Sequence, residues 1–152
     1  MLDQIDKQIL YVLQVDGRIS NLDLAARVNL SPAACHERVS KLEAAGYILQ
    51  YNAQLNPELL GAPLLVFVQI VLDRTCPEVF DAFQRYVLGI PEVLECHMVA
   101  GNFDYLIKAR LKDMNAYREL LGETLVQIGG VRVAHAYMVA EEVRCSTRLP
   151  LS

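Results

Sequence analysis

The stretch SPAACHERVSKLEAAG, residues 31–46, decides how the first third of the chain folds. Its first residue, Ser31, is a favoured N-cap, and Pro32 follows at the first helical turn, where a missing backbone N–H is harmless. Gly46 stands where a helix ends in the left-handed conformation. We therefore predict a helix between these signals. Its apolar positions recur at helical spacing and should face a core: Cys35, Val39 and Leu42.

Two further helices are predicted upstream. Asp3 caps the first, and its apolar residues recur every three or four positions until an Asp-Gly pair stops it. The second begins at Ser20, with Asp23 three residues later as in a capping box, and ends at Asn29. Only residues 29–31 separate the second and third helices, which is the tight connection of a helix-turn-helix.

The outward face of the third helix suits DNA. Its N-terminal turn is small enough to enter a major groove, His36 could reach a base edge, and Arg38 and Lys41 on one flank could reach phosphates. The alternative is a plain three-helix bundle with solvated charges, because basic and acidic side chains are nearly balanced over residues 1–50. If DNA is bound, we expect the contacts to come from Ser31, Pro32, Ala33, His36, Glu37, Arg38, Ser40 and Lys41.

A change of pattern follows this module. Residues 47–51, YILQY, alternate enough to predict a short strand, which would be the wing of a winged helix or simply a linker strand. Two clusters of proline, glycine and asparagine then interrupt the chain. We therefore expect a helix-turn-helix domain at residues 1–50, a connector at 51–63 and a second domain at 64–152.

The second domain alternates strand-like and helix-like segments. The patterns predict, in order, strand, helix, strand, strand, helix and strand, at residues 64–72, 77–88, 93–100, 103–111, 113–128 and 131–143. A two-residue turn, Gly101-Asn102, joins the second and third strands. This βαββαβ order is the ferredoxin-like unit, whose two helices cover one face of an antiparallel sheet. The fold class is therefore α+β.

The first predicted strand, LLVFVQIVL, has apolar residues on both of its faces, with Gln69 as the polar exception. An antiparallel sheet with one solvated face should alternate apolar and polar residues. A domain of this size is also marginally stable on its own. We therefore expect a second copy of the chain to cover the other face, the alternative being a single unusually hydrophobic strand.

Composition excludes several classes of protein. The 152 residues are 53% hydrophobic and 21% charged with a net charge of −4, so neither wholesale disorder nor a uniformly basic nucleic-acid coat is expected. No apolar stretch approaches the roughly 20 residues that span a bilayer, and the start lacks the features of an export signal. The four cysteines form no C-x-x-C pair and are expected to be reduced thiols in the cytoplasm.

Other chemistries find little support in the sequence. In the third predicted strand, FDYLIKARL, the aromatic residues Phe103 and Tyr105 cluster at the turn end, and the first predicted strand has no exposed platform, so an RNA-recognition module is not expected. No nucleophile elbow, zinc-protease, Walker or dinucleotide motif is present, so we expect no enzymatic activity and no cofactor. We also expect no metal site, because the spacings fit no closed zinc pattern among Cys76, Cys96, His97, His135 and Cys145.

The residues also resemble a known family. The opening LDxxDxxIL, the following DGRIS and the pattern LAxxVxLSPxxxxxRVxxLExxGxI, all within residues 2–48, are similar to the amino-terminal signature of the Lrp/AsnC, or feast/famine, regulators of prokaryotes. The stretch PEVLECHMVAGNFDYLIKARLKD resembles the same family. This resemblance implies an amino-terminal helix-turn-helix that binds DNA and a carboxy-terminal, RAM-type βαββαβ module that binds an amino acid and assembles dimers into larger rings.

The effector site is expected at the turn formed by Ala100, Gly101, Asn102, Phe103 and Asp104. A hairpin tip offers backbone N–H groups to a carboxylate, Gly101 permits close approach and Asp104 could neutralise an ammonium group. Gly101 and Asp104 match the family's Gly-x-x-Asp positions, whereas Ala100 and Asn102 depart from its usual Thr and acidic residue. Without a ligand, the same residues would be an ordinary turn with Asp104 as its hydrogen-bonding support.

These observations together predict a cytoplasmic, sequence-specific transcriptional regulator that binds a palindromic operator on double-stranded DNA. Its effector should be a small apolar amino acid, of the leucine or methionine type, because few charged groups flank the turn. Its partners should be further copies of itself, as homodimers in a larger oligomer, with no membrane involved. The alternative is a small oligomeric amino-acid-binding or metabolic protein whose helical bundle does not bind DNA.

Overall fold

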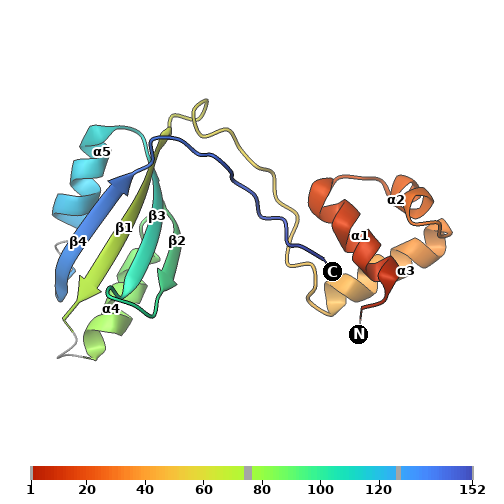
Figure 1. The fold of residues 1–152 in the computed structure, drawn as a ribbon, viewed down its shortest axis with the longest axis horizontal. Coiled ribbons are helices and arrows are strands. Elements are labelled where there is room, and N and C mark those ends of the chain that lie inside the picture. Colours follow the sequence, from red (N-terminus) through yellow and green to blue (C-terminus); the bar gives the residue numbers. More distant parts are fainter. Residues whose placement is uncertain (1, 74–76, 126–127, 152) are drawn as a thin grey trace. The chain divides into compact units, whose positions relative to one another are not determined.

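The structure is a computed structural model that describes residues 2–73, 77–125 and 128–151. It consists of two compact units, drawn in Figure 1. The first comprises Met1–Gln54 together with the tail Arg144–Ser152, and the second comprises Leu55–Val143. The tail therefore groups with the first unit, whereas the sequence analysis attached it to the second.

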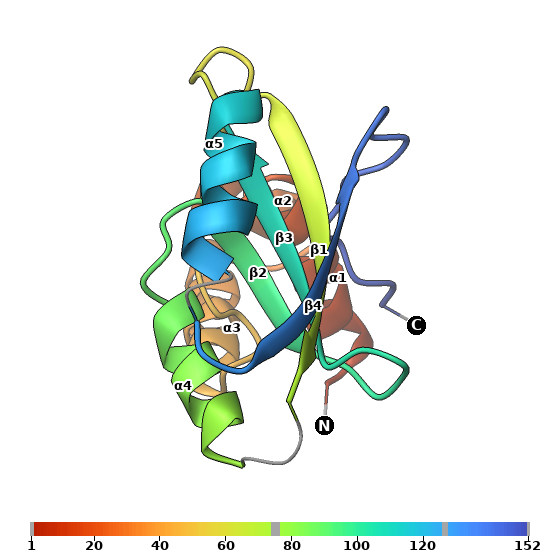
Figure 2. The same ribbon diagram turned by 90° about the vertical axis from the view of Figure 1, so that its left-hand side faces the viewer.

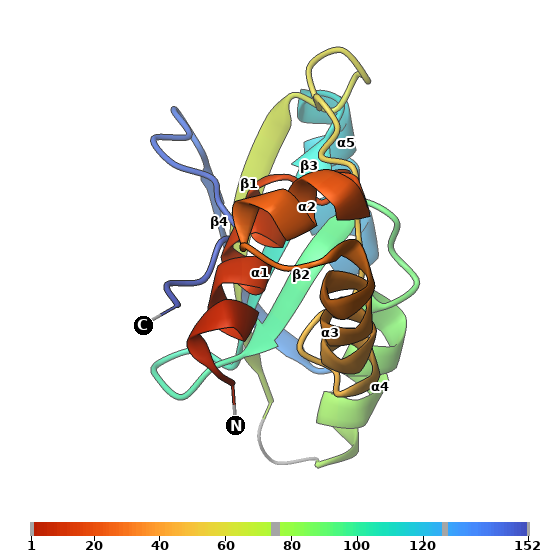
Figure 3. The same cartoon turned by 90° about the vertical axis from the view of Figure 1, so that its right-hand side faces the viewer.

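The first unit contains three helices: α1 (Gln4–Val15), α2 (Asn21–Arg27) and α3 (Pro32–Ala44), packed together as Figure 3 shows. Each begins at the predicted cap. Asp3 and Asp6 form a reciprocal capping box on α1, and Ser20 and Ser31 accept a backbone N–H at the starts of α2 and α3. After the C-cap of α3, Gly46 has φ of +75°, so the predicted left-handed end of this helix is confirmed.

One apolar core holds these helices together. Ile9 from α1 and Cys35 from α3 are fully buried, and the remaining buried members are Leu24, Ala25, Val28 and Leu42. Burial in this core raises the pKa of the Cys35 thiol. Between α2 and α3, Asn29 adopts φ of +55°, a conformation that asparagine tolerates better than most residues and that lets the chain turn sharply. The predicted helix-turn-helix is confirmed.

The expected wing strand is not seen: residues 47–51 are described and form no regular strand. Side chains rather than strand pairing hold this segment. Ile48 packs against the helical core, and the Tyr51 hydroxyl donates a 3.0 Å hydrogen bond to Glu43 on α3. Partial burial and the neighbouring Glu43 carboxylate raise the pKa of Tyr51 to about 12.

Within its described residues, the second unit is a four-stranded antiparallel sheet with helices on one face (Figure 2). The spatial order β2-β3-β1-β4 is the one predicted for a ferredoxin-like unit. The strands are β1 (Leu64–Leu72), β2 (Val93–Met98), β3 (Tyr105–Leu111) and β4 (Val131–Met138). The helices are α4 (Glu78–Val87) and α5 (Met114–Arg118), the latter continued by the π-helical segment η1 (Glu119–Leu125).

The core of this unit lies between the sheet and the helices. Val66, Val68 and Ile70 of β1 are fully buried, and Phe83 of α4 packs on them with its ring centroid 4.8 Å from that of Tyr105 on β3. Packing is also tight where the chain enters β4. Gly130 has φ of +96°, and a Cβ atom there would lie 2.3 Å from a methyl group of Val79.

Several elements differ in type or bounds from those predicted. The helix expected over residues 113–128 begins as α5 after its N-cap Asp113 and continues as a π-helix to Leu125, and residues 126–127 of the prediction lie outside the described residues. The last strand ends at Met138 rather than at Val143. The connection between β2 and β3 spans residues 99–104 instead of two residues, because Asp104 turns inward and bonds to β1.

Candidate DNA-binding face and effector turn

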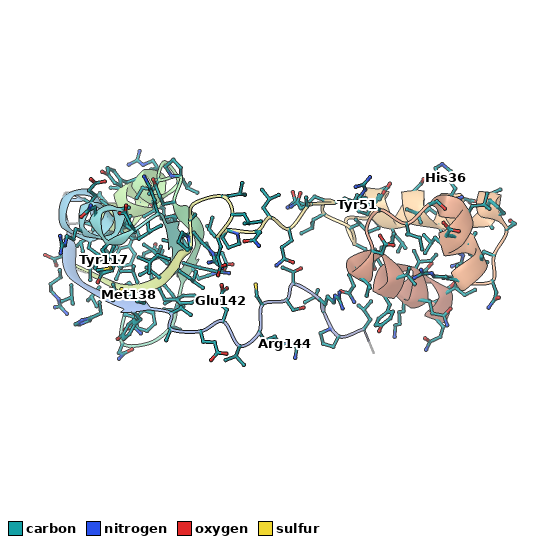
Figure 4. All side chains as sticks on the ribbon, turned by 90° about the horizontal axis from the view of Figure 1, so that it is seen from above. His36, Tyr51, Tyr117, Met138, Glu142 and Arg144 are labelled. Atoms are coloured by element: carbon teal, nitrogen blue, oxygen red, sulfur yellow. The ribbon has the colours of Figure 1, made fainter. Side chains whose placement is uncertain are left out.

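The predicted DNA contacts lie on one exposed face of α3 and at its N-terminus. Seven of the eight are exposed, and Figure 4 shows one of them, His36, at the surface of the helical unit. Because Cys35 and Leu42 are anchored in the core, these side chains are held facing away from it. The seven are Ser31, Pro32, Ala33, His36, Glu37, Ser40 and Lys41.

Arg38, the eighth predicted contact, has another partner. Its Nη1 atom lies 2.6 Å from Asp3 Oδ2 and 2.7 Å from Asp6 Oδ1, so one guanidinium group joins α3 to the start of α1. The backbone N–H of Asp6, followed by the guanidinium of Arg38, holds the pKa of the Asp3 carboxyl below its usual range. In this structure Arg38 fixes the position of α3 rather than extending toward solvent, an attachment to α1 that the sequence analysis did not anticipate.

Lys41 is the most available cation of this face. Its Nζ atom lies 2.6 Å from Glu37 Oε1, one turn earlier on α3, and both side chains are about 70% exposed. The ammonium group of Lys41 lowers the pKa of the Glu37 carboxyl. Exposed pairs of this kind contribute little to stability, so Lys41 can exchange Glu37 for a phosphate at small cost. Glu37 would then be free to accept a hydrogen bond from a cytosine amino group.

A groove of about 470 Å³ borders the flank of α3. It runs between this helix, the start of α1 and Tyr47, and its lining includes three of the predicted contacts, Glu37, Arg38 and Lys41. Asp6 also lines it, where it bonds to Arg38. Sequence reasoning missed the roles of Asp3 and Asp6 in anchoring α3, although two aspartates three residues apart at a helix start were a usable signal.

The predicted effector turn divides into an open part and a buried part. Ala100, Gly101 and Asn102 are exposed, and a Cβ atom added at Gly101 would meet no other atom within 4 Å. Asp104, in contrast, is only 5% exposed. Its carboxylate accepts the Leu72 backbone N–H at 2.8 Å. This residue therefore has the supporting role at the end of β1 that the sequence analysis gave as the ligand-free alternative.

Backbone bonds complete the support of this turn. The Asp104 N–H donates to the Ile70 carbonyl at 2.8 Å, and its carbonyl accepts from Val99 at 3.0 Å. Asp104 thus joins β1 to both arms of the connection between β2 and β3, and the exposed residues 100–102 project beyond it.

The sheet face opposite α4 and α5, here termed the outer face, is only partly apolar. Phe67 of β1 lies there, with Tyr137 of β4 and Lys108 of β3 opposite it on the two sides. Next to these residues, Glu95 bonds to Lys108 at 2.8 Å and to His97 at 3.1 Å. The Lys108 ammonium and then His97 hold the pKa of the Glu95 carboxyl below its usual range. A half-buried aromatic centre with charged edges has the pattern of an interface.

Comparison with known protein families gives a match for each part of the chain. Residues 65–149 match the sequence model described as the Lrp/AsnC ligand binding domain, and residues 2–48 match that of the winged helix-turn-helix DNA-binding family. The chain belongs to the Lrp/AsnC family. Its relatives include the leucine-responsive regulatory proteins of Escherichia coli (strain K12) and Salmonella typhimurium (strain LT2), each 55% identical over 148 residues, which cover 97% of this chain and 90% of theirs.

Solved Lrp/AsnC-type structures agree closely in fold. A transcriptional regulator of Neisseria meningitidis in complex with L-Met is 38% identical, with a TM-score of 0.96 over 99% of this chain and 97% of its own. The feast or famine regulatory protein of Mycobacterium tuberculosis complexed with L-methionine is 33% identical, with a TM-score of 0.89 over the full length of both chains. The predicted fold class and the predicted family are both confirmed.

Two further observations concern the described part of this Lrp/AsnC chain. No helix in it is both long and apolar enough to cross a membrane. Among the same residues, no three metal-ligating side chains come together. Of the cysteines weighed for a metal site, Cys76 lies outside the described residues, whereas Cys96 is half-buried and Cys145 is exposed in the tail.

Proposed function

We propose that this chain is a cytoplasmic, non-enzymatic transcriptional regulator that binds a palindromic operator as a homodimer within a larger oligomer. The observation that carries this proposal is the exposed face of α3, whose polar residues face solvent while Arg38 and Cys35 hold the helix on the bundle. A two-fold dimer would present two such helices, and half-sites about one helical turn apart would make the operator an imperfect palindrome. A regulator that binds DNA must lie in the compartment that contains the DNA, which in a prokaryote is the cytoplasm.

The proposed effector is a small apolar amino acid such as leucine or methionine, bound at residues 100–104. Its carboxylate would be bound by backbone N–H groups of the open turn, whose Gly101 leaves space for close approach. The names of the relatives support this class, since they include leucine-responsive regulators and two complexes with methionine. The buried Asp104 would hold the turn in position rather than contact the ammonium group first.

A screen of melting temperature against the twenty amino acids tests the effector. A ligand that binds only the folded protein stabilises it by about 2.7 kcal/mol at one hundred times its Kd. We expect leucine or methionine to raise the melting temperature and acidic or basic amino acids to leave it unchanged. The same sample should bind double-stranded DNA with an affinity that falls steeply as salt rises. A protein that responds to none of the twenty and does not bind DNA would contradict the proposal.

Replacing Lys41 with alanine should weaken DNA binding without unfolding the protein. The ion pair with Glu37 is exposed and adds little stability, whereas a lost phosphate contact reduces the slope of log affinity against log salt by about one. Fluorescence anisotropy over a salt series measures that slope. Replacing Arg18, an exposed cation outside α3, with alanine is the matched control, because it removes the same charge away from the predicted contact face. An unchanged slope in the Lys41 variant would exclude this residue from the phosphate contacts.

Replacing Arg38 with alanine should lower the melting temperature of the helical unit. The substitution removes both ion pairs to α1 and leaves Asp3 and Asp6 next to each other without their cation. Circular dichroism during heating measures the shift, and Arg38→Lys should recover it only in part, because an ammonium group cannot match the guanidinium geometry. If Arg38→Ala melts like the parent but binds DNA less tightly, Arg38 is a DNA contact and the assignment to α1 is wrong.

Replacing Gly101 with tryptophan should abolish amino-acid binding while the fold is kept. The indole ring would extend into the space next to the open turn, where an added Cβ atom meets no other atom within 4 Å. Calorimetry measures the affinity, and Gly101→Ala, which adds only a methyl group, serves as the matched control. Asp104→Ala is a poorer probe, since it leaves the Leu72 N–H without its acceptor. Binding by Gly101→Trp as tight as in the parent would place the site elsewhere.

A further inference from the structure

The tail of the chain is bound to α1 by a single side chain. Gln14 Nε2 donates to the Leu149 carbonyl at 3.0 Å, and the Leu149 backbone N–H donates to Gln14 Oε1 at 2.9 Å. One carboxamide thus satisfies both backbone groups of a residue 135 positions away in sequence. The contact lies within the first unit, to which Arg144–Ser152 belongs, and Figure 1 shows the tail running to the helical unit.

Local sequence prepares Leu149 for this contact. Because Pro150 follows it, Leu149 is restricted to extended conformations. In an extended residue the N–H and C=O groups point to the same side, where a primary amide can pair with both. The preceding residue is also held, since the Arg148 N–H donates to Ser146 Oγ at 3.2 Å. The bound conformation is therefore partly preset, which lowers the entropy lost on docking.

A groove on the same unit receives the next apolar side chain. Leu151 lines a hollow of about 320 Å³ and is 36% exposed, against 70% for Leu149. Two extended residues span about 6.6 Å. This distance equals the rise of about four helical residues, which is the separation of Gln14 from the middle of α1. The tail thus passes along α1 toward its start. The other lining residues come from α1, α2 and the turn after it: Gln4, Lys7, Gln8, Tyr11, Val12, Arg27, Val28 and Asn29.

We propose that residues 148–151, here termed the strap, dock on α1 of their own chain and give the DNA-binding unit a second attachment. The first attachment is the connector, whose Tyr51 bonds to Glu43 on α3. Nine residues, 139–147, separate the last strand of the second unit from the strap. Docking therefore adds a second link along the chain to the one that the connector already provides. By pre-positioning two DNA-binding units in an oligomer, the strap raises affinity for an operator with two half-sites. That last step rests on the proposed function.

Amide hydrogen exchange tests the docking itself. In the full-length protein the Leu149 amide should exchange at least about tenfold more slowly than in Gln14→Met, which keeps the side-chain length and removes both hydrogen bonds. The Arg148 amide, bonded to Ser146, is the internal reference and should be unchanged. Gln50→Met, at an exposed glutamine of the same unit, is the matched control. Equal exchange in parent and Gln14→Met overturns the proposal, as does protection that appears only when the protein is concentrated, since a second copy would then supply the tail.

DNA binding tests the consequence. Gln14→Met, and separately Leu151→Asp, should weaken binding to a two-half-site operator by about threefold or more, because the effective concentration of the second unit falls. Binding to a single half-site should be unchanged. Equal affinities of parent and variants for the two-half-site DNA, with Leu149 protected only in the parent, overturn the regulatory step. A parent that binds no DNA contradicts the proposed function instead, and the exchange experiment still decides whether the strap docks.

Discussion

Replacing Gly130 with alanine is expected to destabilise the sheet unit by about 2–5 kcal/mol. The left-handed backbone costs an L-residue about 1–2 kcal/mol, and overpacking adds about 1–3 kcal/mol. Both terms apply here, since φ is +96° and the new Cβ would lie 2.3 Å from Val79 Cγ1. Chemical denaturation with the spectroscopic signal of the sheet measures the loss, which would be a large fraction of a typical domain's stability.

The neighbouring Gly129 provides the control. A Cβ atom at Gly129 meets nothing within 4 Å, and its φ lies outside the left-handed range, so Gly129→Ala should leave stability nearly unchanged. A second variant, Val79→Ala in the Gly130→Ala background, removes the methyl groups that clash and should recover part of the loss. If Gly129→Ala and Gly130→Ala unfold alike, the packing described between α4 and the start of β4 is wrong.

Replacing Phe67 with lysine should weaken self-association by about 100-fold or more. Phe67 occupies the middle of β1 on the outer face, which we propose is covered by a second copy. An ammonium group buried there without a partner would cost about 3 kcal/mol or more, and Lys108 lies directly opposite as a like charge. Light scattering over a dilution series measures the association, and Phe67→Leu should assemble like the parent. A Phe67→Lys protein that is as stable and as associated as the parent would show that another face carries the assembly.

Features set by neighbours in sequence were predictable. A serine before a proline, or a glycine after an apolar stripe, acts on backbone groups within one turn, so the caps at Ser31 and Gly46 appear where expected. The mainly apolar stretch of β1 likewise has the predicted bounds, Leu64–Leu72. The order of strands and helices then leaves few ways to build the sheet, and the ferredoxin-like order follows from it.

Features set by distant partners were not predictable in the same way. Arg38 has the chemistry of a phosphate contact, but its position is decided by two carboxylates more than thirty residues earlier. Asp104 has the chemistry of an ammonium ligand, yet it turns inward because the Leu72 N–H at the end of β1 needs an acceptor. The expected wing strand at residues 47–51 finds no pairing partner among the described residues of its unit. Residue type suggested these roles, and only the three-dimensional neighbours decide among them.

The anchoring residues and the outward-facing residues lie on different sides of α3, and this separation has a practical consequence for engineering. Residues that hold this helix, such as Arg38 and Cys35, use one side of it, whereas Ala33, His36 and Ser40 point away and share none of those contacts. The outward set can therefore be exchanged for that of another regulator without disturbing the bundle. Libraries randomised at these three positions, with the anchoring side left intact, would yield folded variants whose operator preferences can be selected rather than redesigned.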